Sequence, residues 1–256
     1  MDMVVQEEMN DLCDCFILRS VDYKDYDVIL TTITKEYGKV AFHASGIRKM
    51  NSKNARNTLL YTKSKFLFDY KQNKTIFRLK GANTVQLYRN MHENLKSSLA
   101  ASVIAEVTDS LMLEGASFLL VSKVFDFVDV SFHYLNEGKD TDTILALYLI
   151  DLMKVSGFEP DVDECTICGS TRVSSISSEE GGFLCETCAR LKHKKLMPVE
   201  RLKRFRLLVK AGLAYFDLVE NFGGATKEDL EILVDILRKH AGIGLKSFLL
   251  YTKVSD

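Results

Sequence analysis

Four cysteines form two close pairs late in the sequence. Two residues separate Cys165 from Cys168, two separate Cys185 from Cys188, and sixteen lie between the pairs. This spacing is typical of four-thiolate zinc sites, because two thiolates on one tight turn can bind the same tetrahedral ion. Glycines beside both pairs suit such turns. Four thiolates leave no ligand position for water, so the array predicts one structural zinc ion rather than a catalytic one.

Two disulfides, an iron–sulfur cluster and four unrelated thiols are the alternatives to zinc. Disulfides require an oxidising compartment. The leader Met1–Asn10 is acidic and lacks the basic and apolar regions of a signal peptide, and the longest apolar run, Ile144–Met153, is too short to cross a bilayer. We therefore expect a soluble cytoplasmic protein that does not enter membranes, in which a cysteine array binds metal.

The chemistry-bearing residues need elements to hold them, and the first part of the chain predicts strands. Alternating or β-branched apolar residues predict five of them, in a region that ends near Gln86. Five short strands over about 75 residues fit a small barrel such as the oligonucleotide/oligosaccharide-binding (OB) fold. The predicted strands are Cys13–Val21, Val28–Thr34, Gly38–Ala44, Leu59–Tyr70 and Thr75–Gln86.

The charge of this region is strongly basic although the whole chain has a net charge of −1. Residues 15–85 hold 14 lysines and arginines against 5 acids. A basic groove on a barrel with aromatic rings nearby is typical of single-strand binding, where cations contact phosphates and rings stack on bases. Tyr37, Tyr61 and Phe66 are the aromatic candidates. The alternative is a solvated basic surface above a core that contains these rings.

Helical periodicity replaces the strand pattern after residue 86. An i+4 ridge runs from Met91 to Leu111, a second amphipathic helix from Phe118 to Leu135, and an apolar helix from Thr141 to Ser156. The third should be central and buried, with Gly157 ending it. Thr226 and Asp229 resemble a capping box that begins a later helix.

A second basic segment follows the cysteines. Residues 190–210 contain nine lysines and arginines and one acid, on a predicted helix with apolar residues on its other side. It could contact phosphate, bind an acidic partner tail, or simply be a solvated helix face.

Catalytic motifs are missing from the sequence. The stretch Gly244–Ser247 lacks the glycine directly before its lysine that a phosphate-binding loop requires. The five histidines are scattered, and no nucleophile, base and oxyanion donor can be assembled. We expect the protein not to be an enzyme.

The order of these motifs resembles the bacterial recombination mediator family RecO. The resemblance covers nearly the whole chain. It rests on the loop Gly38–Lys49, the helix exit Gly157–Pro160 before Cys165, the Gly181–Cys188 segment, and Leu245–Phe248. It implies an α+β protein, in which an N-terminal five-stranded OB-type β-barrel precedes an α-helical domain that carries a four-cysteine zinc insert.

The resemblance also implies a function. RecO proteins bind single- and double-stranded DNA, anneal strands, and help load RecA onto DNA coated by single-strand-binding protein (SSB), with RecR as partner. We expect the acidic tail of SSB to dock on the helical body. Some members lack the cysteines, so zinc should not carry the activity. The residues expected to contact DNA are Arg48, Lys49, Lys53 and Arg56, with Lys39, Lys63 and Lys65 as neighbours.

The predicted organisation has four segments. They are an OB-fold domain over 1–86, a helical domain over 87–160 and again over 196–256, and a zinc-binding insert over 161–195. A zinc-stabilised, non-enzymatic adaptor that binds RNA or protein through the barrel is the alternative function. A zinc-dependent enzyme is a third, which the closed four-cysteine ligand set disfavours.

Overall fold

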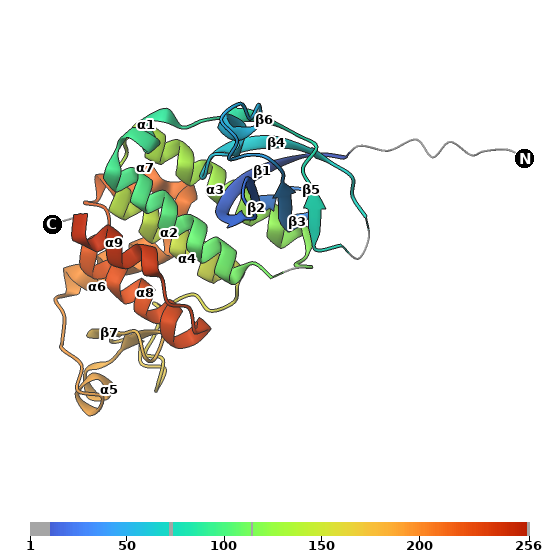
Figure 1. Cartoon of the computed structure of the whole chain (residues 1–256). Helices are drawn as coiled ribbons and strands as arrows, with labels where there is room; N and C mark the ends of the chain where they lie inside the picture. Colours follow the sequence, from blue (N-terminus) through green and yellow to red (C-terminus); the bar gives the residue numbers. More distant parts are fainter. Residues whose placement is uncertain (1–10, 72–73, 114, 255–256) are drawn as a thin grey trace, which may run out of the picture. The chain divides into compact units, whose positions relative to one another are not determined.

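The computed structural model describes residues 11–71, 74–113 and 115–254, so the acidic leader 1–10 lies outside the described residues. The chain forms two compact units (Figure 1). The barrel unit contains residues 11–88 and 108–126. The helical unit contains residues 89–107 and 127–254.

A curled sheet makes up most of the barrel unit. Neighbouring strands follow the order β5-β3-β2-β1-β4-β6, and all pairs are antiparallel except β3 with β5. The strands are β1 (Asp11–Tyr23), β2 (Asp27–Thr34), β3 (Gly38–Ala44), β4 (Lys63–Phe68), β5 (Ile76–Arg78) and β6 (Gly81–Gln86), and a short 3₁₀ helix, η1 (Ala55–Thr58), precedes β4.

The predicted last strand, Thr75–Gln86, is divided into β5 and β6, which gives six strands rather than five. The two stand at opposite edges of the sheet yet only Leu79 and Lys80 separate them. The Leu79 amide donates to the His43 carbonyl (3.0 Å) and the Lys80 amide to the Leu67 carbonyl (2.9 Å). One segment therefore bonds β3 with its first half and β4 with its second, and the sheet curls into an OB-like half-barrel.

Aromatic side chains fill the barrel. Along β3 every second residue is buried, as the alternation predicts, and Phe42 lies between Phe66 and Phe68 with ring centroids 5.2 and 5.1 Å away. Each buried phenylalanine contributes ~1.5–3 kcal/mol of hydrophobic stabilisation. Phe66 is fully buried, so its proposed role as a base-stacking ring was wrong.

Helices form most of the helical unit, and two of them, α2 and α3, extend into residues of the barrel unit. The helices are α1 (Arg89–Glu93), α2 (Leu95–Leu111), α3 (Phe118–Glu137), α4 (Thr141–Val155), α5 (Glu186–Leu191), α6 (Val199–Ala211), α7 (Phe216–Asn221), α8 (Lys227–Ala241) and α9 (Lys246–Val254), with a 3₁₀ turn, η2 (Leu213–Tyr215), before α7.

The ridge from Met91 to Leu111 is not one helix, because the chain breaks at Asn94. The Asn94 side chain accepts a hydrogen bond from the Ser97 amide (2.9 Å), so Asn94 caps the start of α2. The i+4 spacing of apolar residues continues across this cap, which is why periodicity alone did not reveal the break.

Helix α4 is the centre of the helical unit, as predicted. It contacts α6, α7 and α8, and eleven of its fifteen residues are buried. Asp140 caps its start by accepting from the Thr143 amide, and Gly157 takes a positive φ of 82° just past its end. The buried apolar sequence thus supplies the surface on which the other helices pack.

The cysteine-rich insert between α4 and α6 is small. It contains a two-stranded hairpin, β7 (Ser175–Ser177) and β8 (Gly182–Leu184), and the short helix α5. Strands of three residues bury too little surface to be stable alone, so other contacts must hold this hairpin in place.

Candidate metal centre and nucleic-acid interface

The four cysteines of the insert meet at one point. The sulfur atoms of Cys165, Cys168, Cys185 and Cys188 all lie within 4.8 Å of one another, and those of Cys168 and Cys185 are 3.6 Å apart. Sulfur atoms on a tetrahedral zinc ion would be ~3.8 Å apart, because each Zn–S bond is ~2.3 Å. A disulfide would need ~2.05 Å. All four are free thiols, so the arrangement fits zinc and excludes the two-disulfide alternative.

Backbone geometry sets the cysteine turns. Gly169, after the first pair, has a φ of 72°, where glycine is favoured, and its amide donates to the Cys165 carbonyl (2.8 Å). At Gly182 a Cβ atom would lie 2.2 Å from the Asp161 carbonyl oxygen. Strand β8 can therefore form its backbone hydrogen bonds with Asp161 only because Gly182 has no side chain.

Hydrogen bonds favour ionised sulfur at Cys165 but not at its pair mate Cys168. The backbone hydrogen bond from Ser170 lowers the pKa of Cys168, but hydrogen bonds with Cys165 and Cys185 outweigh it, so that pKa is raised. Burial raises the pKa of Cys165, but backbone hydrogen bonds from Cys185, Ile167 and Cys168 outweigh it and lower the pKa to about 6. A hydrogen bond with Cys185 raises the pKa of Cys188 to about 12. Four thiolates this close repel one another, and a bound divalent cation would hold all four ionised.

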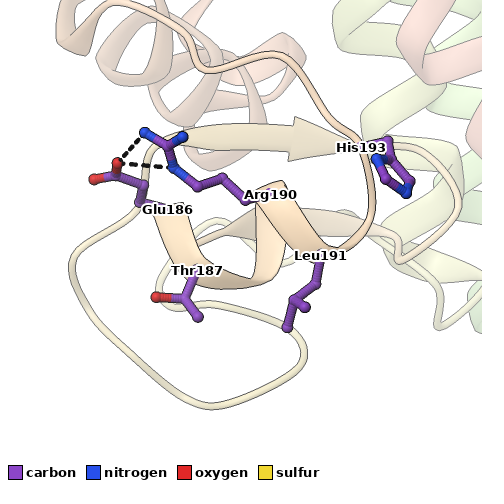
Figure 2. Close-up of a pocket in the computed structure, with 5 residues that line it drawn as sticks. All are labelled: Glu186, Thr187, Arg190, Leu191 and His193. Atoms are coloured by element: carbon purple, nitrogen blue, oxygen red, sulfur yellow. Dashed lines mark hydrogen bonds and ion pairs between the residues drawn. The ribbon is translucent and has the colours of Figure 1, made fainter.

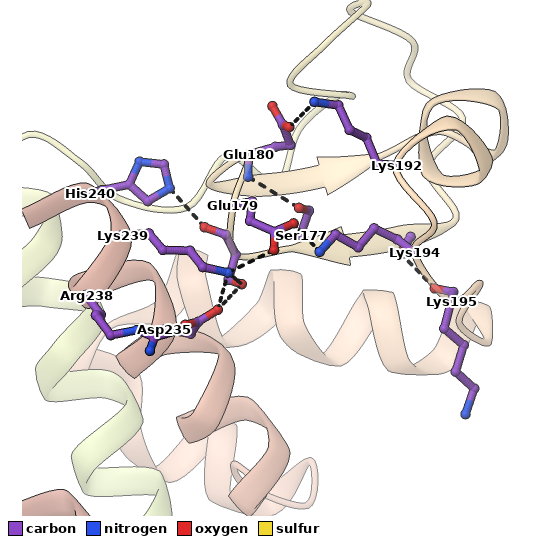
Figure 3. Close-up of polar contacts among 12 residues, drawn as sticks. Ser177, Glu179, Glu180, Lys192, Lys194, Lys195, Asp235, Arg238, Lys239 and His240 are labelled. Carbon is purple, nitrogen blue, oxygen red and sulfur yellow. Dashed lines mark hydrogen bonds and ion pairs between the residues drawn. The ribbon is translucent and has the colours of Figure 1, made fainter. Parts of the chain in front are cut away.

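Ion pairs attach the β7–β8 hairpin to α8 (Figure 3). Lys239 lies 3.1 Å from Glu179 and 2.6 Å from Asp235, and Ser178 donates a short hydrogen bond to Asp235. His240 Nε2 is 2.9 Å from the Ser178 carbonyl oxygen. The insert that carries the four cysteines is thus packed against α8 as part of the helical unit.

The basic segment 190–210 is largely neutralised within the helical unit. Lys192 pairs with Glu180 (2.7 Å), and Arg206 and Lys210 both pair with Asp163 (2.7 Å each). On α6, Arg201 and Arg204 flank the fully buried carboxylate of Asp229 on α8. The exposed lysines of the segment for which the described residues provide no ion pair are Lys195 and Lys203.

A surface hollow of about 540 Å³ lies beside α5 (Figure 2). Its lining residues are Glu186, Thr187, Arg190, Leu191 and His193. Arg190 donates two hydrogen bonds to Glu186, at 2.7 and 3.1 Å. This face is therefore charge-balanced, unlike the basic surface of the barrel unit.

The barrel unit presents a basic loop, residues 44–58, that is fixed at both ends. At the first end the Gly46 amide donates to Asp27 Oδ1 (2.8 Å), and the Arg48 amide donates to the Tyr26 carbonyl (3.0 Å). At the second end Asn57 donates to the Ala82 carbonyl on β6 (2.7 Å). These hydrogen bonds anchor both ends of the loop, which reduces the entropy lost when a ligand orders it.

The loop carries four of the predicted DNA-contacting residues, and all four are exposed: Arg48, Lys49, Lys53 and Arg56. Arg48 pairs with Asp22 at 2.9 Å, with both side chains largely in solvent, so a phosphate could replace the carboxylate at little cost. Arg56 borders a hollow of about 440 Å³ that Leu59 and Thr84 also line.

The other three predicted residues have partners within the barrel unit. Lys39 donates to the Asp109 carbonyl (2.7 Å) and is mostly buried. The ammonium of Lys63 lies 5.7 Å from the Phe16 ring centroid, and Lys65 lies 3.5 Å from Asp14. These three lysines thus make contacts within the barrel unit, whereas the four loop cations are exposed to solvent.

Aromatic rings beside the basic loop come from a turn that sequence reasoning missed. Tyr37 packs on Phe68, and its hydroxyl donates to Asp11. By contrast Tyr23 and Tyr26, around the β1–β2 turn, are about half exposed. A Tyr-Lys-Asp-Tyr turn next to a basic loop was the available signal.

A carboxylate occupies the start of α9, where the sequence superficially resembled a phosphate loop. The amides of Lys246 and Ser247 donate to Glu106 at 3.0 and 2.8 Å. The helix end is therefore satisfied from within, in agreement with the rejection of that motif. Among the described residues, no helix combines the length and apolar character needed to cross a membrane.

Comparison with known proteins finds two matching family models. Residues 9–88 match Recombination protein O N terminal, and residues 92–248 match Recombination protein O C terminal. Relatives named DNA repair protein RecO include one from Shouchella clausii, 27% identical over 91% of both chains, and one from Bacillus subtilis, 26% identical over 92% of this chain and 91% of the relative. Another, from Halalkalibacterium halodurans, is 30% identical over 67% of this chain and 66% of the relative.

Proposed function

Because the chain belongs to the RecO family of DNA repair and recombination proteins, which are not enzymes, we propose that it binds and anneals single-stranded DNA. It also binds double-stranded DNA and, with RecR, helps load RecA onto DNA coated by SSB. The acidic tail of SSB docks on the helical unit. The protein works in the cytoplasm, at the nucleoid during repair.

The basic loop of the barrel unit carries this proposal. Arg48, Lys49, Lys53 and Arg56 are exposed, while the loop backbone is fixed to Asp27 and to β6. Fixed cations at this density suit a phosphate chain, and each phosphate contact releases counterions. Lys39, Lys63 and Lys65, which contact Asp109, Phe16 and Asp14, are proposed as neighbouring DNA contacts with a smaller share of the binding.

Zinc at Cys165, Cys168, Cys185 and Cys188 has a structural role in this proposal. The four thiols match a closed tetrahedral ligand set, and the insert they hold is attached to α8 through Glu179 and Ser178. When bound, the ion supplies cross-linking of the two cysteine turns, and no step of annealing passes through it.

A salt titration of single-stranded DNA binding tests the function. In each variant the loop cations are replaced by glutamine, and binding of an oligo-dT strand is measured by fluorescence anisotropy between about 50 and 300 mM salt. Each lost phosphate contact should reduce the steepness of log K against log salt by ~0.7, so replacing all four should reduce it by about 3. Annealing of complementary strands should slow in parallel.

The matched control replaces Lys195 and Lys203, which are exposed on the helical unit. Their replacement should leave the salt dependence unchanged, whereas the pair Arg48→Gln and Lys49→Gln should lower it. An unchanged slope in the four-residue variant would remove the loop from the DNA interface. Absence of both DNA affinity at low salt and annealing would favour the adaptor that binds RNA or protein.

A further inference from the structure

Two tyrosines stand at the β1–β2 turn with much of their surface in solvent. Tyr23 is 43% exposed and Tyr26 is 53% exposed. Folding alone does not require large rings here, since a short turn between antiparallel strands is normally made by small or polar residues. About half of each tyrosine is therefore accessible to a ligand.

The turn and the basic loop form one continuous surface. The Arg48 amide donates to the Tyr26 carbonyl (3.0 Å), and Asp27 accepts from the Gly46 amide (2.8 Å). Asp27 Oδ2 also lies at hydrogen-bonding distance, 2.8 Å, from His43 Nε2. The His43 ring in turn packs edge-on against the Tyr23 ring, with the ring centroids 5.4 Å apart. Both tyrosines therefore lie at fixed positions beside the loop cations.

Cations and rings alternate on this surface. The Lys24 ammonium is 5.2 Å from the centroid of Tyr23, and the Lys49 ammonium is 5.7 Å from that of Tyr26. Single strands are held by this combination, because phosphates pair with the cations while unstacked bases lie against the rings. A duplex keeps its bases stacked on one another, so it can offer the same surface only its phosphates.

We propose that Tyr23 and Tyr26 stack on unpaired bases and make the basic face of the barrel unit selective for single-stranded over double-stranded DNA. This inference rests on the proposed function, since it assigns the specificity of the same site. The loop cations supply affinity for both forms of DNA. The two rings supply affinity for the single strand alone.

The test compares single-stranded oligo-dT with a blunt duplex of equal length, for the double variant Tyr23→Leu and Tyr26→Leu. Single-strand affinity should fall by roughly tenfold or more, because each stacked base contributes substantially to binding. The salt slope should not change, and duplex affinity should stay within about twofold. Restoring rings with Tyr23→Phe and Tyr26→Phe should recover single-strand affinity.

Tyr215→Leu is the matched control, because Tyr215 is an exposed tyrosine of the helical unit. It should bind both DNA forms like the unmodified protein. Photocrosslinking of the unmodified protein to 5-iodouracil in the oligonucleotide adds a readout that needs no variant. Mass spectrometry should find the crosslinks at Tyr23 or Tyr26.

Other outcomes distinguish failure of the stacking role from failure of the proposed function. Equal losses on single strand and duplex, an unaffected single-strand affinity, or crosslinks confined to other residues would overturn the stacking role. If the tyrosine variants bind normally while the Arg48 and Lys49 variants do not, the stacking inference fails and the proposed function stands. If neither set affects binding, this face of the barrel unit is not the DNA interface. The proposed function itself fails only if the unmodified protein neither binds nor anneals single strands.

Discussion

The carboxylate of Asp151 is partly buried in the helical unit, where it accepts one backbone hydrogen bond. It lies on α4 and accepts from the Leu213 amide at 2.8 Å. Burial raises its pKa above the ordinary value, and that hydrogen bond only partly opposes the shift. A Cβ atom on Gly212 would lie 2.3 Å from Asp151 Oδ1, so the close approach depends on glycine. The charged form is therefore held at a cost.

Replacing Asp151 with Asn should raise stability at neutral pH. A raised folded-state pKa means that the folded protein binds the proton more tightly, so this contribution to stability is full below the unfolded pKa and is lost as pH rises through the folded pKa. Asn keeps an acceptor without the charge. Thermal unfolding should show a higher Tm for Asp151→Asn at pH 7 and a smaller difference near pH 4.

Asp151→Ala is the companion variant. It removes the acceptor and leaves the Leu213 amide unpaired, at a cost of ~1–3 kcal/mol. A lower Tm for the Asn variant at pH 7 would show that the charge itself stabilises the fold.

Individual residue roles were predictable where the partner is close in sequence. Thr226 and Asp229 form the capping box that the sequence indicated. The burial of Asp229 between Arg201 and Arg204 was not predictable, because those partners lie on another helix. For the same reason the cations of residues 190–210 could be counted but not known to be paired.

At the scale of elements, we expect the stability of the insert to depend on metal binding by its four cysteines. Its two strands have three residues each, and its few attachments to α8 are ion pairs and hydrogen bonds. Hydrogen bonds from Lys239, Ser178 and Arg238 lower the pKa of Asp235 to about 2 in spite of burial, so the carboxylate stays charged at physiological pH. Phe183 also packs on Phe205 of α6, and we expect a metal ion on the four cysteines to add to the stability of the insert.

Replacing Cys165 and Cys168 with Ser should abolish zinc binding and destabilise the helical unit. Loss of a structural metal belongs to the most damaging class of substitutions, at about 4 kcal/mol or more. Metal analysis should find one zinc per chain in the unmodified protein and none in the variant, and denaturant unfolding should give the stability loss.

Cys13→Ala is the control, because Cys13 is buried like Cys165 but lies on β1 in the barrel unit. It should keep one zinc per chain. Unmodified protein purified without chelator and free of zinc would argue against the metal centre.

Elements were predictable where periodicity decides them. The alternation of β3 and the buried α4 are as expected. The break at Asn94 was missed because a side-chain cap does not alter apolar spacing. The division of Thr75–Gln86 was missed because it depends on which strands the segment meets.

At the scale of the whole molecule, charge is unevenly distributed. The net charge is −1, yet residues 15–85 hold 14 basic and 5 acidic residues. The loop cations of the barrel unit are exposed, whereas most cations of residues 190–210 pair within the helical unit. Composition predicted the basic region, but only the fold distinguishes exposed cations from paired ones.

Removing zinc from the whole chain should therefore lower stability without lowering affinity for single-stranded DNA. The four cysteines belong to the helical unit and the basic loop to the barrel unit. After treatment with a strong chelator, the Tm should fall, while anisotropy at 15–20 °C, roughly the range in which domains are most stable, should give the same Kd.

Adding zinc back provides the control and should restore the Tm. Loss of DNA affinity in proportion to zinc removed, in protein that is still folded, would contradict this separation of roles.

The pairing of residues 76–86 with both β3 and β4 also limits when the sheet of this unit can be completed during synthesis. β3 and β4 each keep one unpaired edge until that segment has left the ribosome. At ~5–20 residues per second, the interval between the end of β3 and the end of β6 lasts a few seconds. Open edges can pair with other chains during that time. We therefore expect slower translation between residues 44 and 86 to raise the fraction of nascent chains that aggregate before the sheet is complete.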